Sequence, residues 1–235
     1  MRLIPIKTRT IKPKDDLVKL INKPLKNGDI LVIASKVLAY SQGRLLDANS
    51  AEFNKIVEKE GKKLFPTNYC NLTFKEGHLI PNAGVDKSNT PKGQIVLWPK
   101  NPFKEAEQIQ KELRTKHKLS KLGVIISDST CAPMRVGVHG ISIGHFGFEG
   151  IEDVRNKKDI FGKPLKVTRR NLADSLADAA TILMGESNAR IPFVIIRDAP
   201  VKFTNKKVRR SYIRLKSDLY YGIYNNEFKK FLTRS

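Results

Sequence analysis

The chain has 235 residues, and 44 Lys and Arg against 23 Asp and Glu give it a formal net charge of +21. Hydrophobic residues make up 40% of the sequence, a fraction too high for a disordered basic tail. The sequence has no run of about 18 apolar residues, the length needed to cross a membrane. The first residues lack a signal-peptide apolar segment, and Cys70 and Cys131 form no C-x-x-C pair, so we expect a cytoplasmic protein with reduced thiols.

The first half of the chain alternates short strands and helices. Apolar runs bounded by turn residues predict strands, and Asp, Asn or Ser before an apolar stretch predicts a helix start. The predicted elements are a strand over 2–6, a helix from Asp16 to about 23, a strand over 30–34, a helix from Asn49 or Ser50 to Gly61, and short strands broken by Pro and Gly between 69 and 98.

The second half continues this alternation. The predicted elements are a mostly solvent-facing helix from Pro102 to 117, a buried strand over 124–126 that ends at Ser127, a helix from Asn171 to Met184 stopped by Gly185, a strand over 193–196, and a helix around 212–231. Because no repeat, linker or shift in composition interrupts the chain, we expect one α+β or α/β unit over residues 1–235.

The positive charge favours an anionic partner without selecting one. Basic residues are scattered along the chain, with the densest run at 206–210, and there is no RNP stretch, zinc-finger spacing or heptad-linked basic region. We therefore expect most of the charge to solvate the surface. Nucleic-acid binding remains the alternative function.

Three acidic residues occur where α/β proteins gather functional groups. Asp86 lies in a turn-rich segment, Asp128 follows a buried strand beside the hydroxyl of Ser129, and Glu186 comes just after a helix stop. Carboxylates beside a hydroxyl suit a hard cation such as Mg²⁺ or Mn²⁺. An Asx turn, a helix cap and a solvated surface acid are the alternative interpretations of the three acids.

The glycine series from Gly137 to Gly150 fits neither a P-loop nor a dinucleotide-binding motif. Bulges and tight turns in strands are the simpler interpretation. Within this series, His139 and His145 are predicted to be structural histidines with satisfied ring nitrogens. Cys131 lacks a partner histidine in a nucleophile pattern, so we interpret it as a small apolar residue.

Five segments together resemble one protein family. They are S-K-V-L-A-Y-S-Q-G-R at 35–44, N-A-G-V-D-K-S-N at 82–89, I-I-S-D-S at 125–129, K-D-I-F-G-K-P-L-K-V-T at 158–168 and A-D-S-L-A-D-A-A-T-I-L-M-G-E at 173–186. In this order they are similar to the coenzyme F420-0:L-glutamate ligase family of γ-glutamyl ligases, over about residues 1–200. Residues 201–235 would be a basic, helical extension.

The resemblance implies an unusual α/β fold with a mixed sheet, a homodimer, and a ligase that joins L-glutamate to a carboxylate of an anionic coenzyme acceptor. It implies GTP or ATP as co-substrate and two Mg²⁺ or Mn²⁺ ions. The metal positions that it implies are Asp86, Asp128, Ser129 and Glu186. The nucleotide positions are Thr8, Arg9, Thr10, Ile11, Ser35, Lys36, Asn89, Met184, Gly185, Ser187, Asn188, Ala189, Arg190 and Ile191.

Two positions depart from the family pattern. Tyr40 stands where the family has a lysine, and Lys36 is an alternative source of that phosphate contact. The loop C-A-P-M-R at 131–135 keeps Arg135 but has Ala132 in place of an arginine. A proline-containing loop is similar to that of relatives proposed to act on folates, so the implied acceptor is either F420-0 or a folate.

The implied mechanism activates the acceptor carboxylate as an acyl phosphate, which the amine of glutamate then attacks. Asp128 is expected to hold metal at the phosphates, and Arg135 is expected to clamp a carboxylate or phosphate. The candidates for the base that deprotonates the amine are Asp153, Asp159, His139 and His145. A protein that kept the fold, lost this chemistry and binds nucleic acid is the alternative.

Overall fold

The computed structural model describes residues 1–48, 50–206 and 211–223. Its contacts divide the chain into two compact units. Unit 1 comprises Met1–Asp47 and Lys87–Ser211, and unit 2 comprises Ala48–Asp86 and Tyr212–Ser235. The assignment of residues 1–235 to a single ligase-like unit remains a prediction. Within the described ranges, no helix is long and apolar enough to span a bilayer.

Unit 1 is built on a five-stranded sheet in the order β1-β12-β2-β8-β9. Its strands are β1 (Arg2–Ile6), β12 (Phe193–Arg197), β2 (Asp29–Ala34), β8 (Leu122–Thr130) and β9 (His139–Phe146). Strands β2 and β8 are parallel, and every other neighbouring pair is antiparallel. The mixed sheet with its helices confirms the predicted α+β or α/β class.

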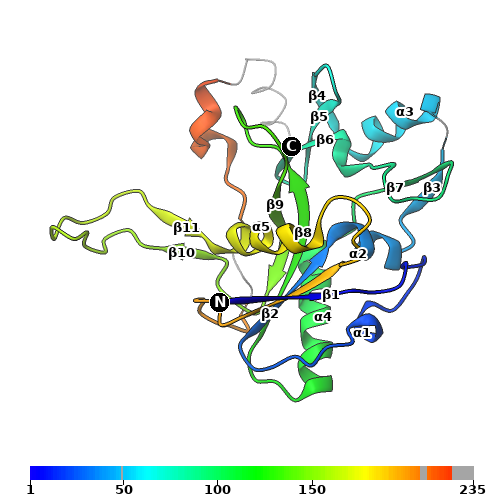
Figure 1. The fold of residues 1–235 in the computed structure, drawn as a ribbon. Coiled ribbons are helices and arrows are strands. Elements are labelled where there is room, and N and C mark those ends of the chain that lie inside the picture. The colour runs from blue at the N-terminus through cyan, green and yellow to red at the C-terminus, as the bar shows by residue number, and fades with distance from the viewer. Residues whose placement is uncertain (49, 207–210, 224–235) are drawn as a thin grey trace. The chain divides into compact units, whose positions relative to one another are not determined.

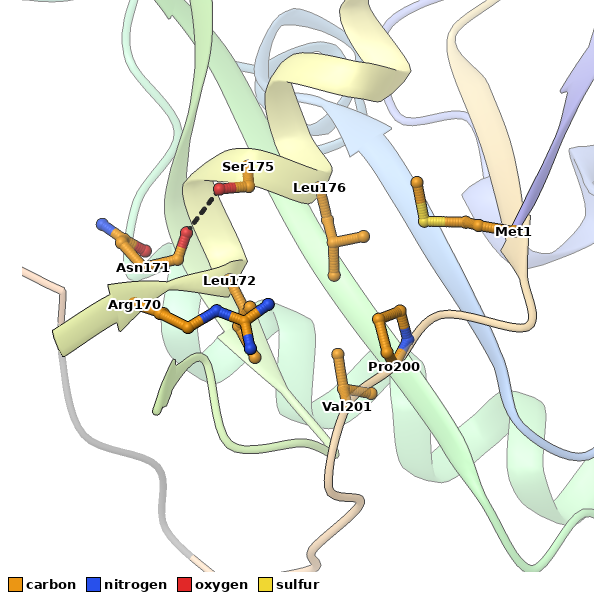
Figure 2. Close-up of a pocket in the computed structure, with 8 residues that line it drawn as sticks. All are labelled: Met1, Arg170, Asn171, Leu172, Ser175, Leu176, Pro200 and Val201. Atoms are coloured by element: carbon orange, nitrogen blue, oxygen red, sulfur yellow. Dashed lines mark hydrogen bonds between the residues drawn. The ribbon is translucent and has the colours of Figure 1, made fainter. Parts of the chain in front are cut away.

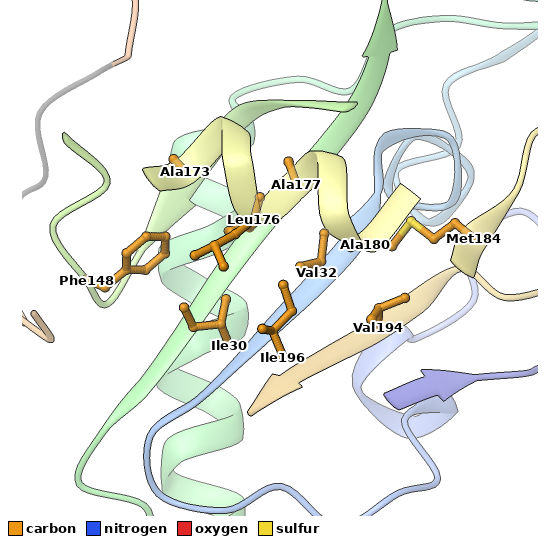
Figure 3. Close-up of a cluster of buried hydrophobic side chains, with 11 residues drawn as sticks. Ile30, Val32, Phe148, Ala173, Leu176, Ala177, Ala180, Met184, Val194 and Ile196 are labelled. Atoms are coloured by element: carbon orange, nitrogen blue, oxygen red, sulfur yellow. The ribbon is translucent and has the colours of Figure 1, made fainter. Parts of the chain in front are cut away.

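Two helices cover this sheet, α5 (Leu172–Met184) in front and α4 (Pro102–His117) behind (Figure 3). Successive side chains of a strand point to opposite faces, so β2 can bury residues on both. Ile30 and Val32 of β2 pack with Ala177 and Ala180 of α5 in one apolar cluster. The prediction that helix α4 is mostly solvent-facing is wrong, because α4 buries Ala106, Ile109 and Leu113 along one side.

Helix α5 packs against the edge strand β9 and accepts hydrogen bonds from its backbone. The Asp178 carboxylate accepts a hydrogen bond from the Gly140 backbone N–H (2.7 Å), and the Asp174 carboxylate accepts one from the Ser142 N–H (3.0 Å). A Cβ at Gly140 would lie 2.8 Å from the Cα of Asp178. The absence of a side chain at Gly140 therefore lets helix and strand approach closely. The prediction of bulges and turns in the 137–150 segment is confirmed by a register shift in the β8–β9 pairing and by turn glycines such as Gly147.

The remaining elements of unit 1 are short. They are α1 (Leu17–Leu20), α2 (Ser35–Ser41), β3 (Leu45–Asp47) paired with β7 (Gln94–Val96), and β10 (Ile151–Asp153) paired with β11 (Arg169–Asn171). The β10–β11 hairpin extends away from the sheet of unit 1 (Figure 1). The sequence pattern did not predict it, because its connecting segment is rich in Lys and its short strands lack apolar alternation.

The described residues of unit 2 form a helix, a three-stranded antiparallel sheet and three 3₁₀ turns. They are α3 (Ser50–Glu60), β4 (Lys62–Pro66), β5 (Asn71–Lys75), β6 (His78–Pro81), η1 (Asn82–Gly84), η2 (Leu215–Ser217) and η3 (Leu219–Gly222). Helix α3 ends before Gly61, as predicted. Strands β5 and β6 agree with the short strands expected between 69 and 98, whereas β4 lies wholly before that range and was not predicted.

Three predicted boundaries are wrong. The first helix is capped by Asp16 as expected but ends at Leu20, because the approach to Pro24 favours extended backbone. Strand β8 continues to Thr130, because Ser127–Thr130 pair with β9 despite their polar side chains. The tail has 3₁₀ turns rather than an α-helix up to residue 223, and residues 224–231 of that prediction lie outside the described residues.

Candidate functional site

One edge of the unit 1 sheet gathers the segments that the sequence assigns to nucleotide binding. At this edge Ile6, the last residue of β1, pairs with Phe193, the first of β12. Phe193 pairs with Ile33 near the end of β2, and Ala34 lies opposite Ser127 in β8. The stretches after β1, before β12, after β2 and at the end of β8 therefore meet at one side of the sheet, where the ends of parallel strands often hold ligands.

Backbone hydrogen bonds fix these stretches to one another. The N–H of Thr8 donates to the carbonyl of Arg190 (2.9 Å), which joins segment 8–11 to loop 184–191. The N–H of Ala34 donates to the carbonyl of Pro192 (3.0 Å), which brings the same loop to the start of α2. Three of the predicted nucleotide segments, including Ser35 with Lys36, are thus neighbours in unit 1.

Asp128 and Ser129 lie at the same edge, but inside β8 rather than beyond its end. Both are half-buried, and the N–H of Ser129 donates to the Asp128 carboxylate (2.9 Å). The hydroxyl of the preceding residue, Ser127, contacts the sulfur of Met184 at the end of α5 (3.8 Å). The exposed Glu186 follows two residues later, so β8 and the start of loop 184–191 are adjacent.

The metal assignment rests on the chemistry of the donors. Asp128, Ser129 and Glu186 offer carboxylate and hydroxyl oxygens, the ligands that Mg²⁺ and Mn²⁺ prefer, so the donor set fits such an ion. Asp86 belongs to unit 2. Among the described residues there is no group of three or more His, Cys, Asp or Glu side chains arranged to hold a metal. The four metal positions therefore remain predictions.

Arg9 is held by a neighbour that the sequence did not single out. Its guanidinium forms two hydrogen bonds with the Asp15 carboxylate (2.7 and 2.8 Å), which also accepts one from the Lys12 N–H (2.7 Å). The Arg9 hydrogen bonds and the Lys12 N–H lower the pKa of Asp15 to about 2. Asp15 thus fixes the basic side chain of segment 8–11 at neutral pH, a contact that the spacing R-x-x-x-x-x-D alone could not establish.

Lys36 and Tyr40 of α2 both hold the turn at 88–89. The Lys36 ammonium donates to the carbonyl and hydroxyl oxygens of Ser88 (2.9 and 2.8 Å), and the Tyr40 hydroxyl donates to the carbonyl of Asn89 (3.2 Å). Tyr40 is only 8% exposed, and burial raises its pKa. The structure therefore places Asn89 beside α2, the helix that begins with Ser35 and Lys36.

Arg135 lies in the β8–β9 connection, between the exposed side chains of Met134 and Val136. Its own side chain is also exposed. The sequence predicted an apolar role for Cys131 in the same loop, and that prediction is wrong because Cys131 is exposed. The loop sits beyond the strand that carries Asp128, so Arg135 belongs to the same end of the sheet.

Two base candidates, Asp153 and Asp159, are not brought to this edge. Asp153 is bound by the Arg155 guanidinium, which holds its pKa well below the usual range, and Asp159 accepts the backbone N–H groups of Phe161 and Lys163. Both lie on the β10–β11 hairpin, which joins the start of α5. Loop 184–191 follows the other end of α5, about 20 Å away along the helix axis.

The two histidines of β9 differ. His139 is half-buried, whereas His145 is fully buried between the rings of Phe103 and Phe148. Among the described residues neither ring nitrogen of His145 has a hydrogen-bond partner, so the prediction of a satisfied histidine is wrong, and burial lowers its pKa to about 4. Its enclosure makes His145 part of the core rather than a base at the site.

A cavity of about 350 Å³ lies at the opposite edge of the unit 1 sheet (Figure 2). It is lined by side chains from the start of α5, from the residues after β12 and from the N-terminus, among them Met1, Leu176 and Val201. None of the predicted nucleotide or metal residues lines it.

Comparison with known proteins agrees with these motifs. Residues 5–198 match the model of the family described as F420-0:Gamma-glutamyl ligase. The chain is 40% identical over 228 residues to a Methanococcus maripaludis protein named coenzyme F420:L-glutamate ligase, covering 87% of this chain and 91% of that protein. Proteins of the same name from Methanocaldococcus jannaschii and Methanopyrus kandleri are 39% and 33% identical, over 79% and 84% of this chain and 82% and 86% of their own lengths.

Proposed function

The chain belongs to the F420-0:gamma-glutamyl ligase family, and on that premise we propose that it joins L-glutamate through an amide bond to a carboxylate of coenzyme F420-0, with cleavage of GTP or ATP. Its relatives are named coenzyme F420:L-glutamate ligase, which makes F420-0 a better-supported acceptor than a folate. The observation that carries the proposal is the convergence of segment 8–11, Ser35, Asp128 and loop 184–191 at one edge of the sheet.

The chemistry requires a leaving group on an otherwise inert carboxylate. Transfer of the terminal phosphoryl group of the nucleotide to an acceptor carboxylate oxygen gives an acyl phosphate and a nucleoside diphosphate. Attack by the amine of glutamate then forms the amide, and phosphate leaves with the oxygen. We propose that the backbone of segment 8–11 and loop 184–191, with Lys36 and Asn89, binds the nucleotide, and that Arg135 clamps an anionic group of the acceptor or phosphate.

Asp128, Ser129 and Glu186 of unit 1 are proposed to hold divalent ions, and Asp86 of unit 2 is also proposed as a metal ligand. When bound, Mg²⁺ or Mn²⁺ would offset the negative charge of the phosphates. Asp128 is half-buried and its carboxylate accepts a hydrogen bond from the Ser129 N–H, so part of the side chain stays accessible to an ion. Asp153 and Asp159 lie away from this edge and His145 is enclosed in the core. No contact at the site supports His139, so we propose no residue for the role of base.

One assay tests the reaction directly. The purified full chain is incubated with L-glutamate, Mn²⁺ and either GTP or ATP, in parallel with F420-0 and with a folate as acceptor. The proposal predicts a mass gain of one or more glutamyl residues on F420-0 and matching release of phosphate. A mass gain on the folate alone would reassign the acceptor. If neither acceptor gains mass and the protein binds nucleic acid in a salt-sensitive way, the alternative function would be supported.

We also propose that the protein is a homodimer. The β10–β11 hairpin extends from unit 1 and exposes Ile160, Phe161 and Val167 by 92%, 81% and 80%. Apolar side chains gathered on a projecting hairpin are typical of an interaction surface. Sedimentation of the chain and of a Phe161→Asp variant tests this, since the variant is expected to be a monomer. A wild-type monomer at micromolar concentration would contradict it.

A further inference from the structure

Unit 2 contains a left-handed turn directly before Asp86. Asn82, Ala83 and Gly84 have φ angles of 49°, 55° and 70°. L-residues other than glycine visit this region mainly as single residues, because the Cβ then crowds the following carbonyl. Two adjacent non-glycine residues in this conformation, followed by a glycine, form a strained segment that must be held by its surroundings.

Thr73 of β5 holds the centre of this turn. Its hydroxyl accepts a hydrogen bond from the Ala83 N–H (2.7 Å) and donates one to the Ile80 carbonyl (2.8 Å). Both Thr73 and Ala83 are fully buried. A buried hydroxyl with one donor and one acceptor partner is specific in geometry, because the loss of either partner would leave a polar group unpaired away from water.

Two further contacts define the same turn. The side-chain oxygen of Asn82 accepts the Asn71 N–H (3.0 Å), which ties the first residue of the turn to the start of β5. A Cβ added at Gly61 would lie 2.7 Å from the Cβ of Ala83, so this glycine leaves the space that the Ala83 methyl group occupies. The turn is therefore fixed by contacts on several sides within unit 2.

The turn determines where the next residues begin. The N–H of Val85 donates to the carbonyl of Asn82 (2.9 Å), and the Val85 side chain is 4% exposed. Asp86, which is half-buried, follows directly. With the turn closed and Val85 anchored, few backbone torsions remain between the core of unit 2 and the Asp86 carboxylate.

We propose that Thr73 is a positioning residue for Asp86: its hydroxyl holds the left-handed turn at 82–84 and thereby presents the Asp86 carboxylate to the divalent ion. The inference rests on the proposed function, which assigns Asp86 to metal binding. It extends that function to a residue outside the segments that carry the family resemblance.

The test compares four variants of the full chain. Thr73→Val removes the hydroxyl at nearly constant volume, and Thr73→Ser restores it. Thr67→Val is the matched control, because the Thr67 hydroxyl also makes backbone hydrogen bonds in unit 2, to Tyr69 and Cys70, but none to the turn. Asp86→Asn reports the loss of the proposed ligand itself. Each variant is measured for Mn²⁺ binding by calorimetry without nucleotide, for thermal midpoint, and for kcat and nucleotide KM.

We expect Thr73→Val to weaken Mn²⁺ binding and to raise the Mn²⁺ concentration for half-maximal activity by about tenfold, as for loss of one buried hydrogen bond. Thr73→Ser is expected to return both to within about twofold of wild type. Thr67→Val is expected to change neither, whatever it does to the thermal midpoint. If Thr73→Val is unfolded at the assay temperature, Asn82→Ala takes its place. This variant removes the acceptor for the Asn71 N–H, and it is expected to disturb the fold less and to weaken Mn²⁺ binding in the same way.

The outcomes separate this inference from the proposed function. Wild-type Mn²⁺ binding in folded Thr73→Val, or equal weakening in Thr67→Val, would overturn the positioning role while Asp86→Asn still lost binding. Wild-type Mn²⁺ binding and activity in Asp86→Asn would instead remove Asp86 from the metal site, and the inference with it.

Discussion

Aspartate side chains at the two ends of the unit 1 sheet have different surroundings. Asp29, at the start of β2, is fully buried and accepts two hydrogen bonds from the Arg197 guanidinium (2.8 and 2.7 Å) and one from the Lys26 N–H (2.7 Å). Asp128, near the end of β8, is half-buried, and the residue before it, Ser127, contacts Met184. A carboxylate enclosed by fixed donors is a structural element, whereas one that remains partly open can exchange partners with a substrate.

The sharpest test of this contrast is Asp128→Asn. The substitution keeps the size of the side chain but removes the charge proposed to hold metal, so glutamate-dependent nucleotide cleavage is expected to fall by at least about 1000-fold. The thermal midpoint and circular dichroism are expected to stay near wild type. Full activity in Asp128→Asn would remove the metal-site hypothesis.

Asp29→Ala is expected to show the reverse pattern. It leaves the Arg197 guanidinium without its carboxylate partner in a largely buried position, so the free energy of unfolding is expected to fall by about 4 kcal/mol in urea titrations. Activity per folded molecule is expected to remain near wild type at low temperature. A loss of kcat that exceeds the loss of folded protein would show that this end also serves the reaction.

A third prediction concerns His145, in the strand that joins the two ends. Its pKa of about 4 in the folded protein lies below the unfolded value of about 6.5, so between these values the unfolded chain binds a proton that the folded chain does not. Stability is therefore expected to fall by up to about 3 kcal/mol as pH drops from about 6.5 to 4, and then to level off.

Replacement of the histidine isolates that contribution. In His145→Leu, urea titrations across the same pH range are expected to show a smaller decline, because the leucine binds no proton in either state. An unchanged pH profile in the variant would show that other groups, and not His145, cause the decline.

The smallest effect is expected for Tyr40→Phe, which removes only the hydroxyl that donates to the Asn89 carbonyl. Loss of this single hydrogen bond at 3.2 Å is expected to raise the nucleotide KM by about two- to tenfold with little change in kcat. Stopped-flow or steady-state titration with GTP and ATP measures it. A change in kcat without a change in KM would argue against a role in placing Asn89.

The elements that could be predicted from the sequence are those specified by local signals. Asn171 caps α5, Gly185 ends it, and the apolar run at 30–34 forms β2, all as expected. The extension of β8 over Ser127–Thr130 could not be predicted locally, because pairing with β9 overrides the polar side chains. The left-handed turn at 82–84 was visible only as a turn, since its conformation depends on Thr73 and Gly61.

The candidate site was predictable in composition but not in arrangement. The family motifs named its residues, and the topology places those of unit 1 at one edge through the parallel pairing of β2 and β8. The sequence could not show that Lys36 contacts Ser88 or that Asp15 holds Arg9, because these contacts depend on how distant or irregular segments pack. The resemblance suggested Lys36 as an alternative phosphate contact; its ammonium donates to Ser88 in the structure, and the phosphate contact stays a prediction.

The contact between α5 and β9 bears on how the sheet meets other chains. An edge strand with open N–H groups is a template on which a strand of another molecule can add, which leads to aggregation. On β9, the carboxylates of Asp174 and Asp178 already occupy the N–H groups of Ser142 and Gly140. On β1, at the other edge, Pro5 has no N–H to offer. Both margins of the sheet are thus poor templates, which directs any self-association of unit 1 toward side-chain surfaces rather than strand addition.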